Sequence, residues 1–406
     1  MKGSKSLSIS RARSVLRTGA ALVSAGICFV FATGCGPRYQ LTPLEPAPPP
    51  VSGTNGMVVA AHPMAAEAGV RILRAGGNAV DAAIAALFML NVVEPHASGL
   101  GGGGFALVRT ADGEAKVVIY RECAPKGVSP EYYYDPADSL RERMQTGGSA
   151  VCVPGAAAGW SEMLSRWGSG RFDLADLAQD AIAAAEQGFP VDPTLAGLIV
   201  DHFEKLANDS LLSRVFLVDG LVPREVGDTI RQPELAATLR FLVEHGLDSF
   251  YRGPIAEAVA KASHNGGGFI TAEDLEFYRP VTTDPIRAEL GGAYAGYEML
   301  TVPPPSGGGA ALMEAMHLCE LTGVFDQPPL SAAAVHLMSQ CLQQAYIDAH
   351  VRTGDPRVVG NGWRAMSTVD FAHLASAGIS LTAKPVGRTP VPVVDGEDIG
   401  NTTHLV

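Results

Sequence analysis

Apolar stretches alternate with glycine- and proline-containing turns along most of the chain, and their spacing predicts both strands and helices. The apolar run 57–61 predicts a short buried strand. Pro63 then opens a predicted helix over 63–75, because proline is well tolerated at the first helical position. Asn78 is a suitable N-cap for a second helix over 79–91, whose almost entirely apolar composition predicts burial.

The remaining elements follow the same two periodicities. Strands predicted at 105–109 and 116–120 form a hairpin, and residues 155–265 alternate helical patterns with turns. Thr271 and Asp274 are spaced as a capping box. Two further strands and then two further helices are predicted at 284–290, 297–302, 309–321 and 331–350. Modest strand content mixed with helices predicts an α+β or layered α/β fold.

The first 34 residues have the pattern of a signal peptide. Five basic residues precede a largely apolar run over 19–31, which is too short to span a bilayer comfortably. The following Ala32-Thr33-Gly34-Cys35 resembles a bacterial lipobox, which predicts cleavage after Gly34 and a lipid on Cys35. An ordinary cleaved signal and an uncleaved anchor are the alternatives. The lipobox interpretation predicts a bacterial cell-envelope protein, held to the membrane on the periplasmic side.

Proline is concentrated in residues 35–55, which predicts a semi-rigid tether to a globular region that begins at residue 56. Apolar residues make up 47% of the 406 residues, enough for a large core. Only 18% of residues are charged and the formal net charge is −12, which argues against a nucleic-acid partner.

Cysteine and histidine positions give no metal-binding pattern. Of the six cysteines, Cys28 would leave with the signal and Cys35 would carry the lipid. The other four are Cys123, Cys152, Cys319 and Cys341. Export permits disulfides, but a domain of this size does not need them, so we expect mostly buried thiols. His62 and His96 are expected to be hydrogen-bonded structural residues, and no metal or other cofactor is predicted.

The run from Gly99 to Gly104 matches the dinucleotide pattern GxGxxG in letters only. That fingerprint needs a strand, a turn and then a helix, whereas here a predicted helix precedes the glycines and a strand follows them. We therefore expect a loop beside a site, with positive φ angles and close backbone approach. Arg121 ends the second hairpin strand and could hold a carboxylate through two hydrogen bonds, although a surface or Glu-paired arginine is the commoner case.

The string Asn401-Thr402-Thr403-His404 stands near the C-terminal end. Threonine is a weak nucleophile unless a base removes its proton, and one solution is a threonine whose own α-amine acts as that base. A chain cut between Asn401 and Thr402 would meet this requirement. Taken alone, a short string at a terminus indicates only a tail.

Several motifs occur together in the order found in one family. They are Ala60–Pro63, Ala75–Ala83, Val92–Pro95, Ser98–Phe105, Arg121-Glu122, Val153–Gly155, Phe250-Tyr251, Gly268–Leu275, Pro303–Gly308, Gly354–Pro356 and Asn401–His404. In this arrangement the chain resembles a gamma-glutamyltransferase (glutathione hydrolase) precursor over essentially all of 56–406.

The resemblance implies an N-terminal nucleophile hydrolase with an αββα sandwich, made as a zymogen that cleaves itself between Asn401 and Thr402. It implies that Thr402 is the nucleophile, that Thr403 supports it by hydrogen bonding, and that Arg121 holds the α-carboxylate of the substrate. The implied reaction passes a γ-glutamyl group, from glutathione or a related compound, through an ester on Thr402 to water or an acceptor amine.

The sequence departs from the family pattern after Thr402, where four residues follow in place of a long small subunit. We therefore expect a large-subunit region over 56–401, a small-subunit stub over 402–406, an incomplete sandwich, and no activity of this chain alone. A separate small subunit would be its partner. Two other interpretations stay open: a related acylase acting on β-lactam side chains or poly-γ-glutamate, and an inactive envelope lipoprotein that uses the fold for binding.

Overall fold

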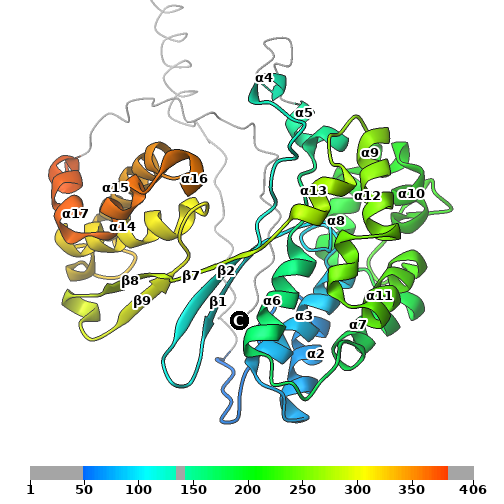
Figure 1. Cartoon of the computed structure of the whole chain (residues 1–406). Helices are drawn as coiled ribbons and strands as arrows, with labels where there is room; N and C mark the ends of the chain where they lie inside the picture. Colours follow the sequence, from blue (N-terminus) through cyan, green and yellow to red (C-terminus); the bar gives the residue numbers. More distant parts are fainter. Residues whose placement is uncertain (1–48, 134–141, 383–406) are drawn as a thin grey trace, which may run out of the picture. The chain divides into compact units, whose positions relative to one another are not determined.

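The computed structural model describes residues 49–133 and 142–382 (Figure 1). The predicted signal peptide with Cys35, most of the predicted tether, and the predicted processing site at Asn401, Thr402 and Thr403 lie outside these residues. Within them, no helix is both long and apolar enough to cross a membrane.

Helices α2 (Pro63–Arg74) and α3 (Ala79–Val93) form where the sequence predicts them. Asn78 accepts hydrogen bonds from the backbone of Val80 and Asp81, and the Asp81 carboxylate accepts from the Asn78 N–H at 2.9 Å. This reciprocal capping satisfies backbone donors that the first helical turn leaves free. Asp81 also accepts from the Ser169 N–H at 3.0 Å and so ties the start of α3 to a distant loop.

Of the strand predicted over 57–61, the described residues keep a single β-bridge residue, Ala60, and no strand. Val58 and Ala60 pack against the core, while Met57 and Val59 are about half exposed, at 48% and 54%. Their alternation is that of an extended chain, but a strand also needs a ladder of backbone hydrogen bonds to a neighbour. The described residues form no such ladder at 57–61.

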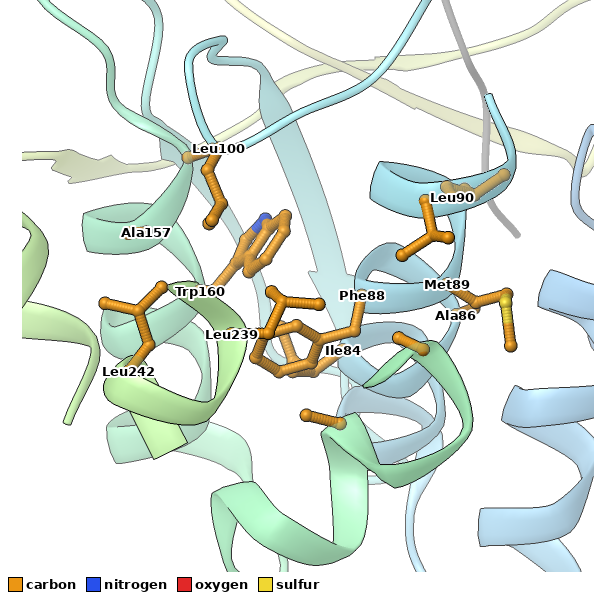
Figure 2. Close-up of a cluster of buried hydrophobic side chains, with 14 of the residues drawn as sticks. Ile84, Ala86, Phe88, Met89, Leu90, Leu100, Ala157, Trp160, Leu239 and Leu242 are labelled. Atoms are coloured by element: carbon orange, nitrogen blue, oxygen red, sulfur yellow. The ribbon is translucent and has the colours of Figure 1, made fainter. Parts of the chain in front are cut away.

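The largest core cluster lies between α3 and the helices that pack on it (Figure 2). Trp160 of α6 (Ala156–Trp167) meets Phe88 of α3 edge-on, with ring centroids 5.1 Å apart. Leu239 and Leu242 of α11 (Pro233–His245) are fully buried in the same cluster. Small residues along α3 allow the neighbouring helices to approach closely.

Three antiparallel strands form the main sheet, in the order β1 (Phe105–Arg109), β2 (Ala115–Ile119), β7 (Val281–Thr283). The register pairs Phe105 with Ile119 and Val118 with Thr282. A mostly exposed turn over 110–114 joins β1 to β2, as the predicted hairpin requires, with Gly113 at φ +93°. The remaining strand pairs are β3 (Phe189–Pro190) with β6 (Thr229–Ile230), β4 (Leu217–Val218) with β5 (Val222–Pro223), and β8 (Ile286–Glu289) with β9 (Glu298–Thr301).

Helices dominate the region between β2 and β7, as the sequence predicts for 155–265. Besides α6 and α11 they are α4 (Pro130–Tyr133), α5 (Glu142–Gln145), α7 (Leu174–Gln187), α8 (Pro193–Asp201), α9 (Phe203–Asn208), α10 (Ser210–Phe216), α12 (Pro254–Asn265) and α13 (Ala272–Phe277). The predicted capping box at the start of α13 is confirmed, since Thr271 and Asp274 exchange hydrogen bonds of 3.0 and 3.1 Å. The mixture of helices with antiparallel strands confirms the α+β class.

The predicted strands at 284–290 and 297–302 appear as β8 and β9, and both predicted helices follow. They are α14 (Gly307–Leu321) and α15 (Ala332–Arg352), with α16 (Pro356–Val359) and α17 (Val369–Ala375) after them (Figure 1). A Cβ at Gly309 would lie 1.9 Å from the Val302 carbonyl oxygen. Glycine at 309 therefore lets the end of β9 pass directly against the first turn of α14.

A carboxyl group is buried between α14 and α15. Glu314 is fully buried, and neither of its carboxyl oxygens accepts a hydrogen bond from an N–H or O–H group of the described residues. Asp348 of α15 faces it and accepts a hydrogen bond from Gln344 at 2.6 Å. Two ionised carboxylates cannot hydrogen-bond each other, whereas a protonated Glu314 can donate to Asp348. Burial and, second, the Asp348 carboxylate therefore raise the pKa of Glu314 to about 8.

Glu314→Gln is expected to weaken the pH dependence of the free energy of unfolding. The folded-state pKa of about 8 exceeds the ordinary 4.5, so the contribution of Glu314 to stability is complete below that ordinary value and is lost as the pH rises through the folded-state value. Glutamine can donate to Asp348 without ionising, so the variant should be the more stable protein in alkaline buffer. Urea unfolding in acidic and alkaline buffers measures this. The exposed Glu244→Gln is the matched control, and parallel pH profiles for Glu314→Gln and wild type would contradict the prediction.

Candidate active site

Arg121 follows the central strand of the main sheet. Because β2 is paired on both sides, the backbone direction at its end is fixed. Tyr278, the residue after α13, donates its hydroxyl to the Arg121 carbonyl oxygen at 2.7 Å. Burial raises the pKa of Tyr278 above its ordinary value and keeps this donor protonated. Segments far apart in the sequence thus hold the Arg121 backbone in one place.

The glycine loop before β1 lies against the same strand end. Gly104 and Tyr120 exchange two backbone hydrogen bonds, of 3.2 and 2.9 Å. A Cβ on Gly103 would lie 2.4 Å from the Tyr120 carbonyl oxygen, so only glycine fits there. The predicted close approach is confirmed. The predicted positive φ is wrong, since the glycines at 99–104, all of them described, have other φ values.

Two further contacts anchor the glycine loop to the helical core. The Asn91 side chain of α3 accepts from the Leu100 N–H at 3.0 Å. The Gly102 carbonyl oxygen accepts from the N–H groups of Gly155 and Ala156, at 2.9 and 3.0 Å, where α6 begins. The order of helix, glycines and strand is as predicted, and it differs from the strand-first order that a dinucleotide fingerprint requires.

Arg121 and Glu122 form an ion pair beside this loop. Arg121 Nη1 lies 2.7 Å from Glu122 Oε2, and the two side chains are 53% and 23% exposed. The Glu122 carboxyl group lies close to Gly103, where a Cβ would come within 3.0 Å of it. A half-exposed guanidinium next to a carboxylate offers a cation and an anion to a ligand that carries both charges. Sequence reasoning gave Glu122 no role of its own, although its place directly after Arg121 was visible.

Other candidate residues have mixed outcomes. His62 is buried, and its Nδ1 accepts from the Met64 N–H at 3.2 Å, so its structural role is confirmed. His96 does not match its prediction, because its buried Nδ1 has no hydrogen-bond partner in the described part of the chain.

Among the cysteines, Cys319 and Cys341 are buried as predicted, whereas Cys123 and Cys152 are only partly buried. Residues 49–133 and 142–382 contain no cluster of three or more His, Cys, Asp or Glu that could hold a metal ion.

Comparison with known proteins places this arrangement in a family. A sequence model of the family described as Gamma-glutamyltranspeptidase matches residues 65–406, and these include the glycine loop, Arg121 and Glu122. The chain belongs to the gamma-glutamyltranspeptidase family. The named relatives in this family are enzymes, which is the class that the resemblance predicts.

Two curated relatives carry different names at the same identity. The chain is 38% identical to the acylase ACY 1 proenzyme of Pseudomonas sp. (strain SE83) over 317 residues, covering 76% of this chain and 56% of the relative. It is also 38% identical to the glutathione hydrolase proenzyme of Bacillus subtilis (strain 168) over 353 residues, covering 85% and 58%. The chain thus spans little more than half the length of these relatives.

Solved structures of gamma-glutamyltranspeptidases have the same fold. The structure is similar to Helicobacter pylori gamma-glutamyltranspeptidase, with a TM-score of 0.77 at 31% identity over 84% of this chain and 95% of that one. It is also similar to a cephalosporin acylase from Bacillus halodurans, with a TM-score of 0.72 at 28% identity over 89% and 66%. The predicted N-terminal nucleophile hydrolase fold is therefore confirmed.

Proposed function

We propose that this chain is the large-subunit part of an enzyme that removes γ-glutamyl groups from glutathione and related compounds. The observation that carries the proposal is the Arg121–Glu122 pair beside a glycine loop that admits no side chain at Gly103. The γ-glutamyl group has an α-carboxylate and an α-ammonium on one carbon. Arg121 would hold the carboxylate, and Glu122 lies close enough to Arg121 to attract the ammonium.

The proposed chemistry needs a nucleophile that these two residues do not supply. In the proposal, the precursor cuts itself between Asn401 and Thr402, and the new α-amine of Thr402 takes the proton of its own hydroxyl. Thr402 Oγ1 then attacks the γ-carbonyl carbon, and the leaving amine departs with the proton returned by the Thr402 α-ammonium, so that an ester forms. Water or an acceptor amine attacks the ester and regenerates Thr402. Thr403 would donate a hydrogen bond to the nucleophile.

Arg121→Lys is expected to raise KM for a γ-glutamyl substrate with little change in kcat. Lysine keeps the positive charge but lacks the planar pair of donors that fits a carboxylate. The value of kcat/KM should therefore fall by about 10- to 100-fold. Steady-state kinetics of the complete, self-cleaved protein with a γ-glutamyl anilide measures the effect. Arg109→Lys, at the far end of β1, is the matched control. A fall in kcat with unchanged KM would contradict the assigned role.

A second candidate activity is hydrolysis of an acyl side chain from a β-lactam. It is favoured by the similarity to the cephalosporin acylase of Bacillus halodurans, with a TM-score of 0.72, and by the 38% identity to the acylase ACY 1 proenzyme, which equals that to the glutathione hydrolase proenzyme of B. subtilis. Both activities would use the same nucleophile and differ in the acyl group that Arg121 must recognise. Assays with glutathione and with an acylated cephalosporin separate them.

We also propose that the protein is lipidated at Cys35 and held on the periplasmic side of a bacterial envelope. This rests on the basic and apolar residues before Ala32-Thr33-Gly34-Cys35. Mass spectrometry of the purified N-terminal peptide tests it. A diacylglycerol-modified Cys35 is the expected result, and a mature chain that begins at another residue would refute it.

The activity proposal has a direct test. The 406-residue chain alone is expected to release no anilide from a γ-glutamyl anilide, because the proposed partner, a small subunit, supplies the rest of the site. Expression of the full reading frame, read from the DNA past Val406, should give a self-cleaved and active protein. A stop codon directly after Val406, with a soluble inactive chain, would support the binding-lipoprotein alternative instead.

A further inference from the structure

Cys319 and Cys341 face each other between two packed helices. Cys319 lies in the last turn of α14, and Cys341 lies near the middle of α15. Both belong to one small apolar cluster with Leu318, Val324, Leu337 and Ala372, and their exposed fractions are 5% and 0%. Two reactive side chains from different helices thus share a closed environment.

The two thiols are neighbours. The Cys319 and Cys341 side chains lie in the same six-residue buried cluster, close enough for each to influence the pKa of the other. Thr322, just beyond α14, holds Cys341 from the other side, with its Oγ1 3.4 Å from the Cys341 sulfur. The Thr322 hydroxyl also donates to the Leu318 carbonyl oxygen at 2.7 Å, which fixes its position.

The thiols are chemically unequal. The neighbouring Cys319 thiol lowers the pKa of Cys341 to about 7, while Cys341 in turn raises the pKa of Cys319. Thiolate is the form that attacks a disulfide. Cys341 is therefore the first nucleophile of the pair, and Cys319 is placed to resolve the product.

We propose that Cys319 and Cys341 are an oxidisable pair whose disulfide links α14 to α15. The Cys341 thiolate attacks a sulfur of a low-molecular-weight disulfide such as oxidised glutathione, and one thiol of the oxidant leaves. The Cys319 thiolate then attacks the mixed disulfide on Cys341, and the second thiol leaves. Two S–H bonds are lost and one S–S bond forms, the oxidant gains two electrons, and its released thiols take up the two protons.

Burial determines when this reaction occurs. Both sulfurs are shielded in the folded chain, so oxidation should be slow in the native protein and fast in partly folded chains, in which α14 and α15 have met but still admit the oxidant. The bond would close a loop of moderate length and restrict the unfolded chain, which should raise Tm by about 5 °C. The proposal concerns the covalent state of the helix pair and does not depend on the proposed γ-glutamyl activity.

Peptide mapping of the 406-residue chain without reduction tests the proposal. The chain is unfolded, refolded with oxidised and reduced glutathione, alkylated and digested. Most of the Cys319 peptide should be recovered linked to the Cys341 peptide, and dithiothreitol should release both. The oxidised chain should also have the higher Tm. Recovery of both peptides fully alkylated, or linkage of either cysteine to Cys123 or Cys152, would overturn the assignment.

Two variants separate the bond from general packing. Cys152→Ser should leave both the linked peptide and the Tm difference between oxidised and reduced samples unchanged. Cys319→Ser should abolish both, leaving Cys341 to be alkylated. If Cys319→Ser does not fold, the wild-type peptide map still decides the question, because it requires no variant. An unchanged Tm difference in folded Cys319→Ser would count against the proposal.

Discussion

Thr402→Ala is expected to leave the precursor uncut and without γ-glutamyl transferase or hydrolase activity. The variant lacks the hydroxyl that starts both self-cleavage and attack on the substrate, and neighbouring groups cannot replace a missing nucleophile. Gel electrophoresis of the expressed full reading frame reports the cleavage, and release of anilide reports the activity.

Thr402→Ser is the matched control, because serine retains the hydroxyl. It should still be processed, at a reduced rate. An uncut but active Thr402→Ala protein would contradict the proposed N-terminal nucleophile, and a cut protein would contradict the proposed route of self-cleavage. The activity of the Thr402→Ala variant is compared with wild type at equal protein concentration.

Trp160→Ala is expected to give the largest loss of folding stability among single core substitutions near α3. Trp160 is 2% exposed and packs edge-on against Phe88, so truncation removes a large buried surface and leaves a cavity (Figure 2). Such a change costs about 3–5 kcal/mol. Urea unfolding followed by circular dichroism measures it.

Trp167→Ala is the control for Trp160→Ala. Trp167 ends the same helix and is only partly buried, so its truncation should cost much less. Trp160→Phe should fall between the two because it refills part of the space. Equal losses for Trp160→Ala and Trp167→Ala would show that the cluster in Figure 2 is not the main source of stability.

Sequence patterns predicted the elements whose causes are local. Asn78 was predicted as an N-cap and Thr271 with Asp274 as a capping box, because each signal lies within one turn of its helix start. The strand predicted over 57–61 is reduced to one bridge residue, Ala60, in the described part of the chain, and the reason is the opposite one. Its apolar residues were visible, but a strand exists only with a hydrogen-bonding neighbour, and a pattern within one segment says nothing about that neighbour.

The candidate site was predictable only in part. Arg121 was found because it ends a predicted strand within a recognisable set of motifs. Tyr278, which fixes the Arg121 carbonyl, lies 157 residues away, and its role depends on a tertiary contact that no local pattern encodes. Glu314 shows the same limit in the core: an acidic residue within an apolar helix was visible, but the facing Asp348 was not.

The hairpin that leads to Arg121 has a consequence for sequence change during evolution. Residues added at the mostly exposed turn over 110–114 would lengthen the loop and leave the pairing of β2 with β1 and β7 unaltered. One residue added within β2 would reverse the facing of every side chain beyond it, Arg121 included. Insertions and deletions inherited by descendants of this protein should therefore collect in that turn, and the turn is also the natural place to insert an epitope tag.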